Sequence, residues 1–154
     1  MTITTWNAAG LFGSVHSQPF QSIAKFKRMQ GLLRRADVVC LQESHGGPGD
    51  LSTLDRECPS HMFWGSFGAK AAIGGVVLAI STEFAEHFND FREIVLSPAR
   101  CLVVQCVGPL GAVQFINLHL EPGLQFDEKA ALLHTIANTA TTFRGFSVFV
   151  GDFN

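Results

Sequence analysis

Residues 101–120 read CLVVQCVGPLGAVQFINLHL, and this stretch determines the fold we expect. It holds two apolar runs, residues 101–107 and 112–120, whose length and composition are typical of β-strands. The segment Val107-Gly108-Pro109-Leu110-Gly111 joins them, and glycine and proline in so short a connection favour a tight turn. The stretch therefore predicts an antiparallel hairpin, and a polar residue, His119, lies near the end of its second strand.

Further strands and helices are expected on both sides of this hairpin. Apolar runs predict strands over residues 3–8, 38–43, 62–67, 75–81, 91–96 and 146–150, the last of them buried. Apolar residues at helical spacing predict helices over residues 22–35 and 127–143, and a shorter one over residues 51–57. The apolar faces of the two longer helices are expected to carry Ile23, Phe26, Met29 and Leu33, and Leu133, Ile136, Ala140 and Phe143. Because strands alternate with helices, the sequence predicts an α/β layered fold.

The composition favours one domain rich in apolar residues. Of the 154 residues, 47% are hydrophobic and only 16% are charged, against about 25% in an average domain. So little charge excludes a disordered acidic or basic tail. The longest uncharged apolar stretch, residues 71–80, is half as long as a membrane span, so no transmembrane helix is expected. The N-terminus lacks a basic segment followed by an apolar one, so no signal peptide is expected either.

The four cysteines, Cys40, Cys58, Cys101 and Cys106, show no Cys-x-x-Cys spacing. Cys40 and Cys106 lie within strand-like apolar runs, which favours buried free thiols over a zinc site. Free thiols are typical of a reducing compartment. We therefore expect an intracellular protein, cytoplasmic or nuclear.

The charges are divided unevenly along the chain. Residues 1–36 hold five basic residues and no acidic residue, and the remaining six basic and all thirteen acidic residues follow. The five are Lys25, Lys27, Arg28, Arg34 and Arg35. They have two interpretations: a contact with a phosphate backbone, or the solvent-exposed face of an amphipathic helix. Charge alone favours the second.

Polar residues stand at or just past the ends of four predicted strands: Asn7, Glu43, His119, and the pair Asp152 and Asn154. Strand ends at one edge of a sheet are where binding sites are commonly built. The two carboxylates, Glu43 and Asp152, would repel each other there unless a cation lay between them. Magnesium fits that position because it binds one or two carboxylates and completes its shell with water and substrate phosphate. The two asparagines can orient phosphate oxygens without adding charge.

Short motifs surround these residues: Thr5-Trp6-Asn7-Ala8-Ala9-Gly10, Leu41-Gln42-Glu43, Asn117-Leu118-His119-Leu120 and Gly151-Asp152-Phe153-Asn154. In this order, with 36, 76 and 33 residues separating Asn7, Glu43, His119 and Asp152, they resemble the signatures of the endonuclease/exonuclease/phosphatase superfamily. The resemblance spans the whole chain. Residues 41–46 also resemble the endonuclease domains of non-long-terminal-repeat retrotransposons. The chain has no tyrosine, and so lacks the one that abasic-site endonucleases carry near the His119 strand.

The resemblance implies a DNase I-like two-layer β-sandwich flanked by helices, of which residues 1–154 would form the N-terminal portion. It implies a magnesium-dependent phosphodiester hydrolase, with Mn²⁺ as an alternative ion and DNA as the partner, most simply a DNA endonuclease of the retrotransposon type. By this resemblance, Glu43 would be the principal metal ligand, with Asn7 as its neighbour at the metal and phosphate. His119 would contact the scissile phosphate or the leaving group. Asp152 would orient or deprotonate the attacking water, and Asn154 would hold a phosphate oxygen.

The family pattern continues past Gly-Asp-x-Asn to a closing Asp-His pair, which residues 1–154 do not contain. We therefore expect one C-terminally incomplete domain over residues 1–154. Its uncovered sheet faces would favour self-association. Two alternatives to a nuclease stay open: a catalytically inactive remnant that binds nucleic acid or protein, and a phosphatase or phospholipase of the same fold that acts on inositol phosphate or a phospholipid head group.

Several further residues have two interpretations each. His45 either reaches nucleic acid or is an exposed loop histidine, and Glu121 is either an accessory acid or a loop carboxylate. The Gly74-Gly75 pair either allows a close backbone approach near the site or is a plain turn into a strand. The other histidines, His16, His61, His87 and His134, show no spacing typical of metal ligands.

Overall fold

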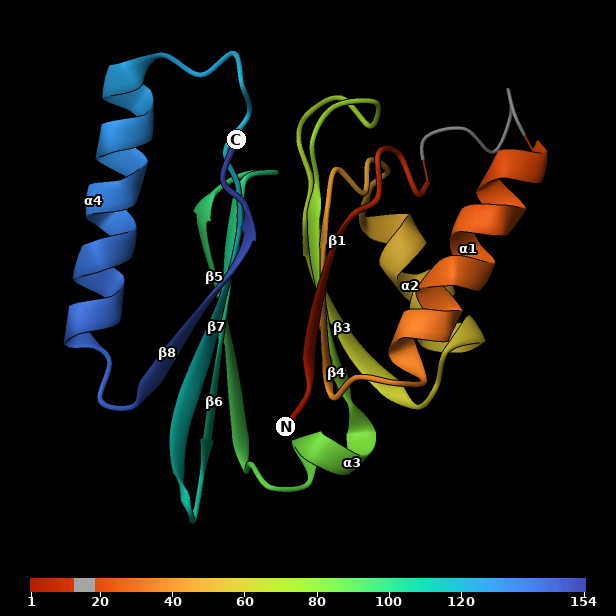
Figure 1. Cartoon of the computed structure of the whole chain (residues 1–154). Coiled ribbons are helices and arrows are strands. Elements are labelled where there is room, and N and C mark those ends of the chain that lie inside the picture. The colour runs from red at the N-terminus through yellow and green to blue at the C-terminus, as the bar shows by residue number, and fades with distance from the viewer. Residues whose placement is uncertain (13–18) are drawn as a thin grey trace.

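The computed structural model describes residues 1–12 and 19–154, with side chains over residues 1–12 and 23–154 (Figure 1). His16 lies outside the described residues. The strands are β1 (Ile3–Asn7), β2 (Val38–Gln42), β3 (His61–Ser66), β4 (Val76–Ser81), β5 (Asp90–Ser97), β6 (Cys101–Gly108), β7 (Gly111–His119) and β8 (Phe146–Asp152). The helices are α1 (Pro19–Leu33), α2 (Pro48–Glu57), α3 (Thr82–Ala85) and α4 (Phe126–Thr142). All elements expected from the sequence are present, and within the described residues the short α3 is additional.

The strands form two four-stranded sheets that pack face to face. Sheet A has the order β1-β2-β4-β3 and sheet B the order β5-β6-β7-β8. Figure 1 shows four layers in sequence: α4, sheet B, sheet A, and α1 together with α2. The expected two-layer sandwich flanked by helices is therefore confirmed. The hairpin expected in residues 101–120 is the antiparallel pair β6 and β7, in register from Cys101 opposite Leu118 to Gly108 opposite Gly111.

Alternation along the strands explains how the layers form. In β2, which is buried along its whole length, Val38 and Cys40 face the other sheet, whereas Val39 and Leu41 face the helices. On sheet B, Phe115 of β7 faces sheet A and its neighbour Ile116 faces α4. Both faces of each sheet are thus apolar, which accounts for the low share of charged residues.

Each sheet contains one pair of parallel strands joined through a helix. β1 leads through α1 to β2, and β7 leads through α4 to β8. The two strands of each pair end at the same edge of their sheet, because parallel strands run in one direction. In register, Asn7 lies opposite Gln42, next to Glu43, and His119 lies opposite Asp152. The polar strand ends identified in the sequence are thereby brought together in two pairs.

The prediction of a buried strand at residues 146–150 is wrong. β8 is an edge strand of sheet B, and Phe146 and Phe149 are 82% and 49% exposed. The apolar run is the same as in a central strand, but its position at the edge leaves part of it in solvent. Only β7 pairs with β8 among the described residues.

Over the described part of the chain, helices cover most of the outer faces of both sheets, and exposed phenylalanines remain on β8. Met29 of α1 and Leu54 of α2 pack on the outer face of sheet A, and Ile136 of α4 packs on that of sheet B. The helices that join the parallel strands cover these faces as a consequence of the connection itself. Ile23 of α1 and Leu133 of α4 are exposed. In α1 the apolar face that touches sheet A begins one turn later, at Phe26, and in α4 Leu132 rather than Leu133 packs on sheet B.

All four cysteines are buried and free, as expected. Burial raises the pKa of Cys40, Cys101 and Cys106 to about 12. Their thiols are therefore protonated at neutral pH and behave as apolar side chains. None of the helices in the described residues has the length and apolar character needed to cross a membrane.

Candidate active site

The interior faces of four strands change from apolar to polar toward their carboxyl ends. In β1 the side chains that face the sandwich interior are Ile3, Thr5 and Asn7, and in β2 they are Val38, Cys40 and Gln42. In sheet B the corresponding series are Phe115, Asn117 and His119 in β7, and Val148, Val150 and Asp152 in β8. The polar ends of the four series meet at one end of the sandwich. The site is therefore a property of strand register, because residues at period two share a face.

Glu43 reaches this site through an unusual backbone conformation. It directly follows Gln42, so regular alternation would point its side chain toward the helices. Instead its φ is 48°, in the left-handed region that non-glycine residues seldom adopt. That conformation costs roughly 1–2 kcal/mol. The loop holds it, since the amide of Gly10 donates to the carbonyl of Glu43 (2.6 Å) and the amide of Ser44 donates to that of Gly75 (3.0 Å).

The side-chain amide of Asn7 links the two sheets. Its Nδ2 donates hydrogen bonds to Glu43 Oε1 and to Asp152 Oδ2, both at 2.9 Å. Its Oδ1 accepts from the backbone amide of Ala9 at 3.1 Å, which fixes the orientation of the group. The hydrogen bond from Asn7 is the main reason that the pKa of Asp152 lies below its usual value of 3.8. Asp152 is therefore a carboxylate at neutral pH.

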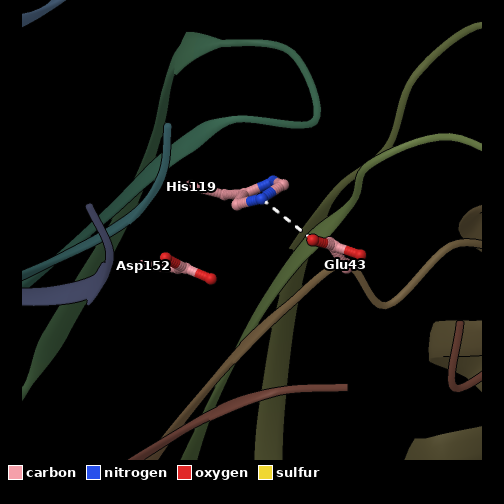
Figure 2. A group of neighbouring side chains, drawn as sticks. All are labelled: Glu43, His119 and Asp152. Carbon is pink, nitrogen blue, oxygen red and sulfur yellow. Dashed lines mark ion pairs between the residues drawn. The ribbon is translucent and has the colours of Figure 1, made fainter. Parts of the chain in front are cut away.

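His119 lies opposite these carboxylates and is 2% exposed. Its Nε2 is 3.2 Å from Glu43 Oε1, a contact that is an ion pair only when the imidazole is protonated (Figure 2). The approach to Glu43 does not have the geometry of a hydrogen bond, so neither ring nitrogen of His119 is hydrogen-bonded among the described residues. A buried ring nitrogen without a partner is costly, so this group is suited to an interaction with a ligand.

Glu43, His119 and Asp152 together could hold a metal ion. One ligand atom of each lies within 4.8 Å of the other two, and Figure 2 shows the three side chains converging from the two sheets. Carboxylate oxygens are the ligands that Mg²⁺ and Mn²⁺ prefer, and the imidazole of His119 offers a nitrogen as a further ligand. The donor set therefore fits a divalent cation. Asn7, expected beside the metal, turns its amide nitrogen toward the carboxylates rather than its oxygen.

A groove of about 300 Å³ opens beside Glu43 and His119 and continues past Ile73 and Glu121. Glu121 pairs with Arg100, with Oε1 at 3.3 Å from Nε, so it lines the groove as a paired carboxylate. His45 lines it too, and burial lowers the pKa of His45 while the Glu43 carboxylate opposes the shift.

The Gly74-Gly75 pair does provide a close backbone approach. A Cβ on Gly75, whose φ is 97°, would lie 2.7 Å from Ser44 Oγ and 3.0 Å from the amide nitrogen of His45. Only glycine allows the loop after β2 to pack this closely on the entry to β4. The pair thus supports the loop that carries Glu43.

Asn154 has an exposed side chain, and its backbone amide donates to Asp152 Oδ1 at 3.2 Å. Of the basic residues on α1, Lys25 approaches the site: its Nζ donates to the carbonyls of Ala9 and Gly10. The sequence patterns predicted no role for Gln42 and Asn117, although both are buried beneath the site. Polar residues inside otherwise apolar runs were the available signal.

The family model described as the Endonuclease/Exonuclease/phosphatase family matches residues 4–154. None of the curated proteins matches the chain by sequence.

Solved structures resemble the chain along nearly its whole length. The 3′ phosphatase NExo from Neisseria, bound to a product DNA hairpin, has a TM-score of 0.69 at 21% identity and covers 100% of this chain and 58% of its own. Humanized TDP2 from D. rerio has a TM-score of 0.66 at 19% identity, and the match covers 99% of this chain and 65% of that protein. An AP endonuclease from Archaeoglobus fulgidus has a TM-score of 0.62 at 21% identity, and the match covers 99% of this chain and 56% of that protein. The chain thus spans between about half and two thirds of these proteins, and the DNase I-like fold is confirmed.

Proposed function

Since the chain belongs to the endonuclease/exonuclease/phosphatase family, we propose that its site serves the divalent-metal-dependent hydrolysis of phosphodiester bonds in DNA. The observation that carries this proposal is the convergence of Glu43, His119 and Asp152 from two sheets, with Asn7 bonded to both carboxylates. The product DNA hairpin bound to the similar 3′ phosphatase supports DNA as the substrate. Within this class, our specific proposal is a magnesium-dependent endonuclease of the retrotransposon type.

Glu43 and Asp152 would hold the cation, with Asn7 beside it. A bound Mg²⁺ supplies charge stabilisation at a phosphate oxygen. His119, buried and without a hydrogen-bond partner among the described residues, is placed to donate to the scissile phosphate. Asn154, beside Asp152, would hold a phosphate oxygen.

Asp152 would orient the attacking water. The hydrogen bond from Asn7 lowers the pKa of Asp152, which makes the carboxylate a weak base. A weak base fits orientation of the water better than complete removal of its proton. The four free cysteines support a reducing, intracellular location. The exposed phenylalanines of β8, Phe146 and Phe149, support self-association through that edge, which sedimentation velocity tests.

The test is nicking of supercoiled plasmid by the whole protein in Mg²⁺, in Mn²⁺ and in EDTA. We expect nicking in either metal and none in EDTA. The isosteric changes Glu43→Gln and Asp152→Asn should each lower the rate by at least about 100-fold, because each removes charge from the reacting centre. Glu121→Gln is the matched control, since this carboxylate lines the same groove but pairs with Arg100.

Other outcomes would identify the alternatives. Hydrolysis of inositol phosphates or phospholipid head groups without nicking would indicate a phosphatase or phospholipase. DNA binding without turnover would indicate an inactive binding protein. Nicking that persists in the Glu43→Gln/Asp152→Asn double variant would contradict the proposed site.

A further inference from the structure

Two amide side chains lie inside the sandwich, between its apolar interior and the candidate site. Gln42 of β2 and Asn117 of β7 are 1% and 0% exposed, and each follows apolar residues on the interior face of its strand. They come from different sheets and are 75 residues apart in the chain. Burying such groups is costly unless every polar atom finds a partner.

All polar atoms of the two amides are bonded. Gln42 Nε2 donates to Asn117 Oδ1 at 2.7 Å and to the carbonyl of Cys40 at 3.3 Å. Asn117 Nδ2 donates to the carbonyls of Leu41 (3.0 Å) and Val77 (2.9 Å). Gln42 Oε1 accepts from Thr5 Oγ1 at 3.1 Å. The network therefore joins β1, β2 and β4 of sheet A to β7 of sheet B.

The network lies directly below the site on the strands that carry it. Gln42 immediately precedes Glu43, Asn117 shares an interior face with His119, and Thr5 shares one with Asn7. Glu43 and His119 stand on opposite sheets, so the separation of the sheets at this level sets the 3.2 Å between Oε1 and Nε2.

Apolar packing alone would not fix that separation closely. Contacts among aliphatic side chains are non-directional and tolerate small shifts of one sheet over the other. Hydrogen bonds require donor and acceptor within a few tenths of an ångström, and a fully bonded buried network rigidifies its surroundings. We propose that Gln42 and Asn117 are positioning residues that hold the two sheets at the separation needed for Glu43 and Asp152 to share one cation, with His119 beside it. This proposal rests on the proposed metal site.

The test replaces both amides with apolar side chains of similar shape, in the double variant Gln42→Met/Asn117→Leu. Removing both partners together leaves no unpaired group between them, so the fold should persist with a similar melting temperature. Mn²⁺ affinity, measured by electron paramagnetic resonance titration, should fall at least about tenfold, the usual effect of losing groups that orient metal ligands. In crystals of the metal-free variant, the distance from Glu43 Oε1 to His119 Nε2 should exceed the 3.2 Å of the parent.

Gln114→Met is the matched control. Gln114 is also a fully buried amide of β7, but it faces α4, with Ser147 Oγ at 2.8 Å and Gln105 Nε2 at 3.0 Å. This variant should keep the parent's Mn²⁺ affinity even if its melting temperature falls. Equal losses of affinity in the control and the double variant would show a general effect of stability and would overturn the proposal.

A double variant that does not fold leaves a second test in Thr5→Val, which removes one bond of the network at an exposed position. A weaker Mn²⁺ affinity in Thr5→Val supports the proposal, and parental affinity refutes it. If the parent binds no Mn²⁺, the proposed function fails, and the distance between Glu43 and His119 in the metal-free crystals still decides the role of the network.

Discussion

The two parallel strand pairs that carry the site are built alike but are held differently. In sheet A, β1 and β2 are joined through α1, and in sheet B, β7 and β8 are joined through α4. Each pair brings two polar strand ends together, Asn7 with Glu43 and His119 with Asp152. The same connection, used once in each sheet, thus supplies one half of the site each time.

The difference lies in how deeply the strands are buried. β2 is buried along its whole length, and backbone hydrogen bonds hold the loop after it to the entry of β4 and to the loop after β1. β8 is an edge strand with half-exposed side chains, and Asp152 at its end is oriented from the other sheet by Asn7. The half of the site on sheet A, whose β2 is deeply buried, therefore orients the half on the less buried β8.

The largest expected effect is on the free energy of unfolding, in variants that truncate an apolar side chain in β2 or in β8. Leu41→Ala in β2 should lower the free energy of unfolding by about 3 kcal/mol, because it leaves a cavity at a fully buried position. Phe149→Ala in β8 removes a larger side chain, but one that is 49% exposed, and should cost about 1 kcal/mol. Urea unfolding followed by tryptophan fluorescence measures both. Equal costs would mean that β8 is as tightly held as β2.

Gly151→Ala should have the next largest effect. A Cβ at Gly151 would lie 1.9 Å from the carbonyl oxygen of Leu118 in the neighbouring strand, so β8 must shift away from β7. We expect a loss of about 2 kcal/mol in the free energy of unfolding, together with displacement of Asp152. Gly123→Ala, which meets no atom within 4 Å, is the control and should change stability by less than about 0.5 kcal/mol.

Asn7→Ala tests whether one half of the site orients the other. It removes the hydrogen bonds to Glu43 and Asp152, so Mn²⁺ affinity should fall about tenfold with little change in unfolding. Isothermal titration calorimetry measures this, with Asn138→Ala on the exposed side of α4 as the control. Parental affinity in Asn7→Ala would show that Asp152 holds its position without help.

The smallest effect concerns pH. In the metal-free parent the pKa of Asp152 should lie below 3.8, and Asn7→Ala should raise it. Because the folded-state pKa is lowered, Asp152 adds stability above its unfolded-state pKa, and this contribution disappears as the pH falls through the folded-state value. The Asn7→Ala variant should therefore lose less stability on acidification. Carboxyl-carbon NMR titration gives the pKa, and an unchanged value would remove Asn7 as the cause.

The difference in burial between β2 and β8 could not be predicted from the sequence. Strand alternation and order along the chain predicted the layers and brought Asn7, Glu43, His119 and Asp152 together. The run Phe146-Ser147-Val148-Phe149-Val150 resembles a buried strand, because an apolar pattern does not tell whether a strand lies at the centre or the edge of a sheet. The orientation of Glu43 depends on one backbone angle. The pairing of Gln42 with Asn117 depends on the register between sheets, which no local pattern encodes.

The hydrogen bond between Asn7 and Asp152 also has a consequence for how the protein is made. It joins residues 145 apart, so it closes nearly the longest loop that residues 1–154 allow. At a synthesis rate of about 5–20 residues per second, Asn7 waits roughly 7–30 s before Asp152 has been added. During that interval Glu43 has neither Asp152 nor the β7–β8 pair of sheet B beside it. The nascent chain therefore cannot bring Glu43, His119 and Asp152 together until β8 has docked.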